Sequence, residues 1–256
     1  MATVPERYFA ASDVGLRNVR PTWWGVVIAD DRFPDVYDLN HARVTGEAGD
    51  LTLPEVVEEL EPLLRPAGAR HLQIEITRPD AAGGLVAEAV AAGLRLSTDT
   101  AMELRGTVPP AADDDGVELA DPGGDLLWDV MRDSYREFDV TQPQVVEQLL
   151  RWNREVLAPH DRWYYLARRE GRVAGIGALQ MAGGIAYVDD VVTFPEFRRR
   201  GVATSVVGRI LRDAADAGAE ATFLLADQPG PIRLYRSLGF EETGTIRTLL
   251  GRAPWT

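Results

Sequence analysis

The sequence predicts an α/β protein, with α+β character, that is made of two units. Three observations support this prediction. Helical and strand patterns alternate in the C-terminal half, a weaker form of the same order occupies the N-terminal half, and a segment rich in proline, glycine and aspartate separates the two. At about 100 to 200 residues per domain, the 256 residues also suffice for two domains of ordinary size.

The separating segment, 107–116, contains two adjacent prolines and three adjacent aspartates. Proline lacks a backbone donor and neighbouring carboxylates repel one another, so this segment is poorly suited to a packed element. We therefore expect an N-terminal domain at 1–106, a linker at 107–116 and a C-terminal domain at 117–256.

In the C-terminal domain, apolar spacing predicts two helices, then three β-rich segments that turn at glycine pairs and form an antiparallel meander. A helix ending near Gly218, a buried strand, a short helix and a last strand follow. The expected elements are helices 126–138, 144–157, 202–217 and 232–238, and strands 163–168, 173–181, 185–194, 221–226 and 243–250.

The N-terminal half reads as strands 23–28, 36–44, 71–76 and 100–104 with helices 54–64 and 85–92. Gly93-Leu94 and Gly239-Phe240 both stand between a helix and a strand. Internal duplication explains this correspondence, and convergence on ordinary α/β units is the alternative.

The composition excludes several classes of protein. Without cysteine there are no disulfides, thiol nucleophiles or zinc-thiolate sites, and the three histidines are too scattered for a metal set. No apolar run approaches the roughly 18 residues of a membrane span, and residues 1–20 lack the apolar centre of a secretory signal. A net charge of −13 argues against nonspecific nucleic-acid binding. We expect a cytoplasmic protein without a metal; a homodimer is left open.

The segment with the strongest chemical signal follows the third strand of the meander. Its residues are Val191, Val192, Thr193, then Arg198, Arg199, Arg200, Gly201, Val202, Ala203 and Thr204. Small residues at the start of a helix expose backbone amides where the helix dipole is positive, and arginines add charge-assisted bonds, so the turn could hold a phosphate. A solvated basic turn is the alternative.

A second motif, Leu234-Tyr235-Arg236-Ser237-Leu238-Gly239-Phe240, lies some 34 residues beyond Gly201. The strand, the Arg-x-x-Gly-x-Ala turn, the helix, the buried strand and this motif together resemble the GNAT superfamily of acyl-coenzyme A dependent N-acyltransferases over about residues 117–250. The resemblance implies a mixed, mostly antiparallel sheet flanked by helices. The N-terminal half would be a degenerate unit, because it lacks the turn and has Ala89 where Tyr235 would stand.

The resemblance also implies the site. Acetyl-coenzyme A would bind with its pyrophosphate on the amides of Arg198–Ala203 and Thr204, and its pantetheine arm along Val191–Thr193. Gln228 stands where many members have asparagine but could still bond the pantetheine; Arg199 and Pro231 also depart from the family pattern. Tyr235 would protonate the departing thiolate, although a packed core tyrosine is the alternative.

The base that deprotonates the acceptor amine is less defined. Asp189 and Asp190 both lie at the end of the third meander strand. Because strand side chains alternate, we expect them on opposite faces, Asp189 with Tyr187 and Val191 and Asp190 with Val188, and we prefer Asp190 as the base. A carboxylate that caps a turn is the alternative for either.

We therefore expect an N-acetyltransferase that acetylates a primary amine of a small molecule or peptide by direct transfer. Residues 1–116 carry 10 Arg and 20 Asp plus Glu, against 17 and 20 in the remainder, and this excess acid favours a cationic acceptor. A noncatalytic acyl-coenzyme A sensor or interaction scaffold is the alternative. A nucleotide-binding protein is disfavoured, because no Walker loop with lysine is present.

Overall fold

The computed structural model describes all residues except 1, 15, 47, 79, 81 and 107–115. They form two compact units, Met1–Ala101 with Gly244–Thr256 and Met102–Thr243. Most of the expected linker, 107–115, lies outside the described residues. The bounds of the units differ from the expected linear division at the C-terminal end, because the last residues of the chain belong to the first unit.

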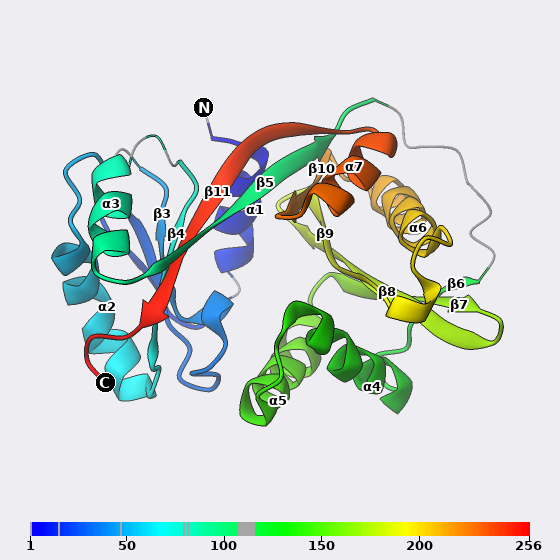
Figure 1. Ribbon diagram of the computed structural model, residues 1–256, viewed down its shortest axis with the longest axis horizontal. Coiled ribbons are helices and arrows are strands. Elements are labelled where there is room, and N and C mark those ends of the chain that lie inside the picture. The colour runs from blue at the N-terminus through cyan, green and yellow to red at the C-terminus, as the bar shows by residue number, and fades with distance from the viewer. Residues whose placement is uncertain (1, 15, 47, 79, 81, 107–115) are drawn as a thin grey trace. The chain divides into compact units, whose positions relative to one another are not determined.

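The first unit has a sheet with helices packed on it (Figure 1). Its strands lie in the order β1-β2-β3-β4-β11-β5, and β3 and β4 are parallel. Every fourth residue of helix α2 is apolar, and Val56, Leu60 and Leu64 are fully buried against strand residues such as Ile74. The elements are helices α1 Val4–Asp13, α2 Leu53–Ala67 and α3 Gly83–Ala91, and strands β1 Val19–Pro21, β2 Gly25–Ile28, β3 His41–Val44, β4 His71–Ile76, β5 Arg95–Leu104 and β11 Phe240–Arg252.

The second unit contains the meander. Strands β7, β8 and β9 are antiparallel, so the predicted meander is confirmed, and β10 lies parallel to β9. The order is β11-β5-β10-β9-β8-β7-β6, since β5 and β11 contribute residues to both units. The elements are helices α4 Asp125–Ser134, α5 Pro143–Trp152, α6 Val202–Asp216 and α7 Pro229–Ser237, and strands β6 Val117–Leu119, β7 Arg162–Arg169, β8 Arg172–Ala182, β9 Ile185–Thr193 and β10 Ala221–Ala226.

The two units repeat one pattern of elements. In each, a strand, a helix of 15 residues, a parallel strand of 6 residues, a helix of 9 residues and a long strand follow one another. Gly93 and Gly239 occupy matching places after the 9-residue helices, with φ of 93° and 92°. The long strands are exchanged: β11 pairs with β4, and β5 neighbours β10. The mixed sheet flanked by helices confirms the predicted fold class.

Near the N-terminus the elements differ from the expected ones in two places that have a clear physical reason. The strand predicted at 36–44 begins only at His41, because buried Asn40 donates to the carbonyls of Phe33 and Val36 at 2.8 and 2.9 Å and holds Tyr37–Leu39 in a 3₁₀ turn. Helix α1 was not expected. A Thr3/Glu6 capping box starts it, and this signal is visible in the sequence.

Candidate functional site

The predicted phosphate-binding turn opens helix α6. After β9, Pro195–Phe197 forms a 3₁₀ turn, Arg199 and Gly201 take left-handed φ angles of 66° and 77°, and the helix begins at Val202. No side chain caps it, and the first amide that bonds back is Ser205 N, to Gly201 O at 3.0 Å. The amides of 202–204 therefore have no acceptor within the helix, and the positive end of the dipole lies there.

Arginines surround this helix start. Arg198 donates to Thr193 O at 3.2 Å and pairs with Glu137, while Arg200 pairs with Glu170 at 3.1 Å. The exposed side chain of Arg199 makes no hydrogen bond or ion pair with another described residue. The structure thus brings together the predicted set of Arg198, Arg199, Arg200, Gly201, Val202, Ala203 and Thr204 at one end of α6.

Two glycines in β8 let α6 lie close to the sheet. A Cβ on Gly175 would stand 2.5 Å from Val192 O and 2.8 Å from the Cγ1 of Val202. One on Gly177 would stand 2.5 Å from Val206 Cγ1. The absence of these two methyl groups therefore sets the distance between the end of β9 and the start of α6.

The carboxylates of β9 correct one expectation. The register of β8 with β9 shifts between Ile176 and Ala178, so Asp190 and Val191 together oppose Gly177, and Asp190 takes a left-handed φ of 50°. Such a bulge breaks the alternation of a strand. Asp189 and Asp190 consequently reach the same side rather than opposite faces.

Beyond the bulge, the side chains of β9 point to the faces opposite to those that strict alternation predicts. Val191 confirms this, because its side chain lies on the α6 side of the sheet with Val188, beside Val206 and Ile210. Strict alternation had predicted that Val191 lies on the same side as Asp189, and it does not. Nothing in the sequence marks the bulge except Gly177, whose missing side chain leaves room for it.

Both carboxylates meet one arginine. The Nη2 of Arg162 donates to Asp189 Oδ2 at 3.0 Å and to Asp190 Oδ2 at 2.6 Å, and its Nη1 donates to Gln180 Oε1 at 2.9 Å. The Arg162 side chain is only 2% exposed. Sequence reasoning missed this residue because it is distant in the chain and begins a strand with no motif of its own.

Next to this arginine lies a buried hydrogen-bond network. The guanidinium lies 5.4 Å from the ring centroid of Tyr164, whose hydroxyl donates to Asn153 Oδ1 at 2.8 Å. Asn153 Nδ2 donates to Tyr135 Oη at 3.2 Å and to Leu149 O at 3.0 Å. Burial, the largest cause, raises the pKa of Tyr164 to about 12, so the network stays protonated at neutral pH.

Tyr235 lies on α7 and is 8% exposed, with its ring edge-on to Phe240 at 6.0 Å. No described residue bonds its hydroxyl. Burial first, and the charge of Asp189 second, raise its pKa to about 12. Gln228 stands at the N-cap position of the same helix without a capping side-chain bond, and its Nε2 donates to Asp227 Oδ2 at 3.1 Å.

The first unit has the matching helix start but not the matching chemistry. Thr52 precedes α2 as Gly201 precedes α6; its backbone N–H donates to Glu55 Oε2 at 2.9 Å, and the N–H of Leu53 donates to Glu88 Oε2 at 2.7 Å. Two amides are thus already bound by carboxylates, which also repel an anion. Ala89 is the seventh residue of α3 and Tyr235 the seventh of α7, so the acid is missing as well.

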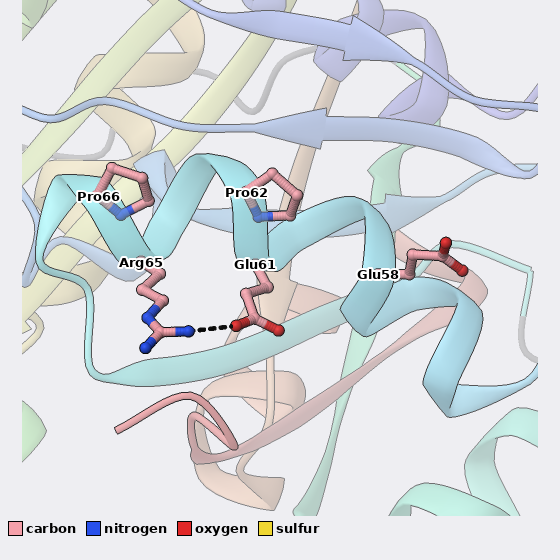
Figure 2. A pocket seen from close by; sticks show the side chains of 5 residues that line it. All are labelled: Glu58, Glu61, Pro62, Arg65 and Pro66. Carbon is pink, nitrogen blue, oxygen red and sulfur yellow. Dashed lines mark hydrogen bonds and ion pairs between the residues drawn. The ribbon is translucent and has the colours of Figure 1, made fainter.

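A shallow surface depression lies on α2 (Figure 2). It is lined by Glu58, Glu61, Pro62, Arg65 and Pro66, and Arg65 pairs with Glu61 at 2.9 Å. It contains no nucleophile and no unpaired cation, so it is not a candidate active site. Within the described residues, no cluster of side chains could hold a metal ion. No helix there has the length and apolar character to cross a bilayer.

Comparisons with known proteins agree with this geometry. The sequence profile of the acetyltransferase (GNAT) family matches residues 125–240. The fold is similar to that of a GCN5-related N-acetyltransferase from Kribbella flavida (TM-score 0.61, 19% identity, covering 96% of this chain and 93% of that one).

Two further solved structures share the fold. One is a functionally unknown conserved protein from Staphylococcus epidermidis (TM-score 0.69, 12% identity, 93% and 94% covered). The other is a tandem GNAT protein from the clavulanic acid biosynthesis pathway (0.52, 17%, 78% and 69%). No curated protein matches the sequence. Residues 125–240, which include the uncapped start of α6, the bulged β9 and the buried Tyr235, thus match the GNAT acetyltransferase family.

Proposed function

We propose that the second unit transfers an acetyl group from acetyl-coenzyme A to a primary amine of a small molecule or peptide. The observation that carries this proposal is the uncapped start of α6, where free amides, a left-handed glycine and an unengaged arginine converge. This donor set fits a pyrophosphate, which needs several N–H donors and positive charge. The first unit offers no equivalent, because carboxylates bind the corresponding amides.

The cofactor would lie along residues already in place. Amides of Arg198–Thr204 and the side chain of Arg199 would hold the pyrophosphate, the backbone of Val191–Thr193 would pair with the pantetheine arm, and Gln228 would bond it from α7. Acetyl-coenzyme A supplies the activated acyl thioester. The chain's own residues bind it, orient it and move protons.

Tyr235 would protonate the departing thiolate. Its pKa of about 12 keeps the phenol fully protonated at neutral pH, which a proton donor requires. The burial that raises this pKa would also raise that of a thiol beside it, so the two groups stay matched. No described side chain competes for the hydroxyl.

The base would be a carboxylate at the end of β9, and the sequence preference is Asp190. A protonated amine must lose a proton before it attacks, and Asp189 and Asp190 carry two negative charges against the one positive charge of Arg162. This residual charge, with the acidic excess of residues 1–116, favours a cationic acceptor.

Calorimetry with acetyl-coenzyme A and a thiol-release assay with a panel of amines test the proposal. We expect binding in the micromolar range and coenzyme A release with at least one amine. The absence of heat at high micromolar ligand would refute the cofactor assignment. Binding without release would support the alternative, a noncatalytic sensor or interaction scaffold, which the pairing of both carboxylates with Arg162 favours.

A further inference from the structure

Arg162 binds both aspartates at the end of β9 and is itself held in place by several groups. It begins β7, its side chain is 2% exposed, and its guanidinium is held by Gln180 and by the face of Tyr164 as well as by the two carboxylates. A planar guanidinium with partners on several sides has one orientation. The two carboxylates that bind its Nη2 therefore have defined positions too.

The two carboxylates are not equivalent. Asp190 lies 2.6 Å from Arg162 and its side chain is 23% exposed, whereas Asp189 lies 3.0 Å away and is 31% exposed. Asp190 belongs to the bulge, and Asp189 stays in register with Ala178. Their electrostatic neighbours differ as well: of the two charges, only that of Asp189 contributes to the raised pKa of Tyr235, whereas Asp190 contributes more than Asp189 to the raised pKa of Tyr135.

We propose that Arg162 is a positioning residue that holds Asp189 and Asp190 together on one side of β9, and that Asp189, rather than Asp190, receives the ammonium group of the acceptor. The inference rests on the proposed acetyl transfer. It assigns Asp190 to the anchoring of Arg162 and places the ammonium site on the more exposed carboxylate.

The positioning role follows from the charges. Two carboxylates that share one side of a bulge would repel each other without a cation between them. Arg162 neutralises one charge and leaves about one negative charge for the ligand. A buried arginine whose partners were removed would carry a large desolvation penalty, so the pair and the arginine depend on one another.

The proton balance of the step is complete. Asp189 takes one proton from the ammonium and passes it to solvent. The nitrogen's electron pair forms the C–N bond while the C–S bond breaks. Tyr235 gives its proton to the sulfur and regains one, through solvent, from the second proton that the nitrogen loses. The sum is amide, free thiol and one released proton.

The first experiment is an NMR titration with butylamine, a simple monovalent ammonium, on the coenzyme A-loaded protein, in which no transfer occurs. We expect Asp189→Asn to weaken butylamine binding at least tenfold and Asp190→Asn to weaken it less than threefold. Asp189→Asn leaves the Asp190–Arg162 pair intact, so the fold should be kept. No butylamine binding by the natural protein, or an equal effect of the two substitutions, would overturn the inference.

The second experiment separates positioning from packing. In Arg162→Met, KM for the amine should rise severalfold while kcat changes less, because the carboxylates that receive the ammonium group lose the cation that holds them. Arg162→Lys should restore most of the affinity for the amine. Acetyl-coenzyme A affinity should stay within twofold in both. An unchanged KM for the amine in a folded variant would reduce Arg162 to a structural role.

The two proposals fail in different ways. If the natural protein binds no acetyl-coenzyme A, the proposed function fails, and the same butylamine titration on the unloaded protein still decides whether Asp189 holds an ammonium group.

Discussion

Gly175 offers a sharp test of how the fold builds the cofactor site. It lies in β8, fully buried, between the end of β9 and the start of α6. An alanine Cβ there would stand 2.5 Å from Val192 O and 2.8 Å from Val202 Cγ1. Real Cβ atoms do not approach so closely, and one of the two contacts is backbone. Gly175→Ala must therefore move β9 and α6 apart.

The cost follows from overpacking. Adding a methylene to a filled core costs about 1–3 kcal/mol, which corresponds to a fall in Tm of about 2–12 °C for a chain of this size. Val192 and Val202 belong to the predicted pantetheine and pyrophosphate contacts. If the displacement weakens the binding free energy of acetyl-coenzyme A by about 1 kcal/mol, its Kd rises about fivefold.

Thermal unfolding by circular dichroism and calorimetry with acetyl-coenzyme A measure the two effects. Gly208→Ala is the matched control, because Gly208 lies inside α6 and a Cβ there would meet only Arg212 Nη1 at 3.7 Å. It should stabilise the protein by about 0.5–1 kcal/mol and leave affinity unchanged. If Gly175→Ala is as stable as the natural protein and binds as tightly, the argument that this close approach shapes the site is wrong.

Three further outcomes are expected. Tyr235→Phe should lower kcat about 10²–10⁴-fold while the Kd for acetyl-coenzyme A changes less than twofold; an unchanged kcat would make the residue a packing tyrosine. Asn153→Ala should lower the free energy of unfolding by about 2–4 kcal/mol in a urea titration, because buried hydroxyls of Tyr135 and Tyr164 lose their partner; a loss below 1 kcal/mol would contradict this. Burial first, then the charge of Arg43, hold the pKa of His41 well below its usual value. As the pH falls below about 6.5, only the unfolded chain then takes up a proton, so the free energy of unfolding should decrease as the pH decreases. His41→Asn should make the free energy of unfolding less dependent on pH in this range; an equal dependence in the variant would refute the assignment.

Much of the second unit could be predicted from sequence. Helical and strand periods placed the meander, α6 and β10 close to their observed bounds, because each burial face repeats along the chain. The turn at Arg198–Gly201 could be singled out because glycine exposes backbone amides and arginine adds positive charge, and both suit a phosphate. Helix α1 could have been found from its capping box, and the 3₁₀ turn at Tyr37–Leu39 could not, since the buried bonds of Asn40 are tertiary.

The candidate site, too, could be predicted only in part. The sequence named Tyr235 and the two aspartates, but alternation placed Asp189 and Asp190 on opposite faces. A bulge opposite Gly177 put them on one side. Arg162 carries no local signal, because it stands 27 and 28 residues before the two carboxylates and on a strand, β7, that is separated from β9 by β8.

By itself, the sequence determined which elements form, which turn has the composition of a phosphate site and which half lacks it, because these depend on neighbours along the chain. Tertiary structure alone decided the exchange of β5 and β11 between the units, the phase of β9 beyond its bulge and the partner of its carboxylates. Strand register and the burial of a charge depend on residues far apart in the sequence, and only the folded chain brings them together.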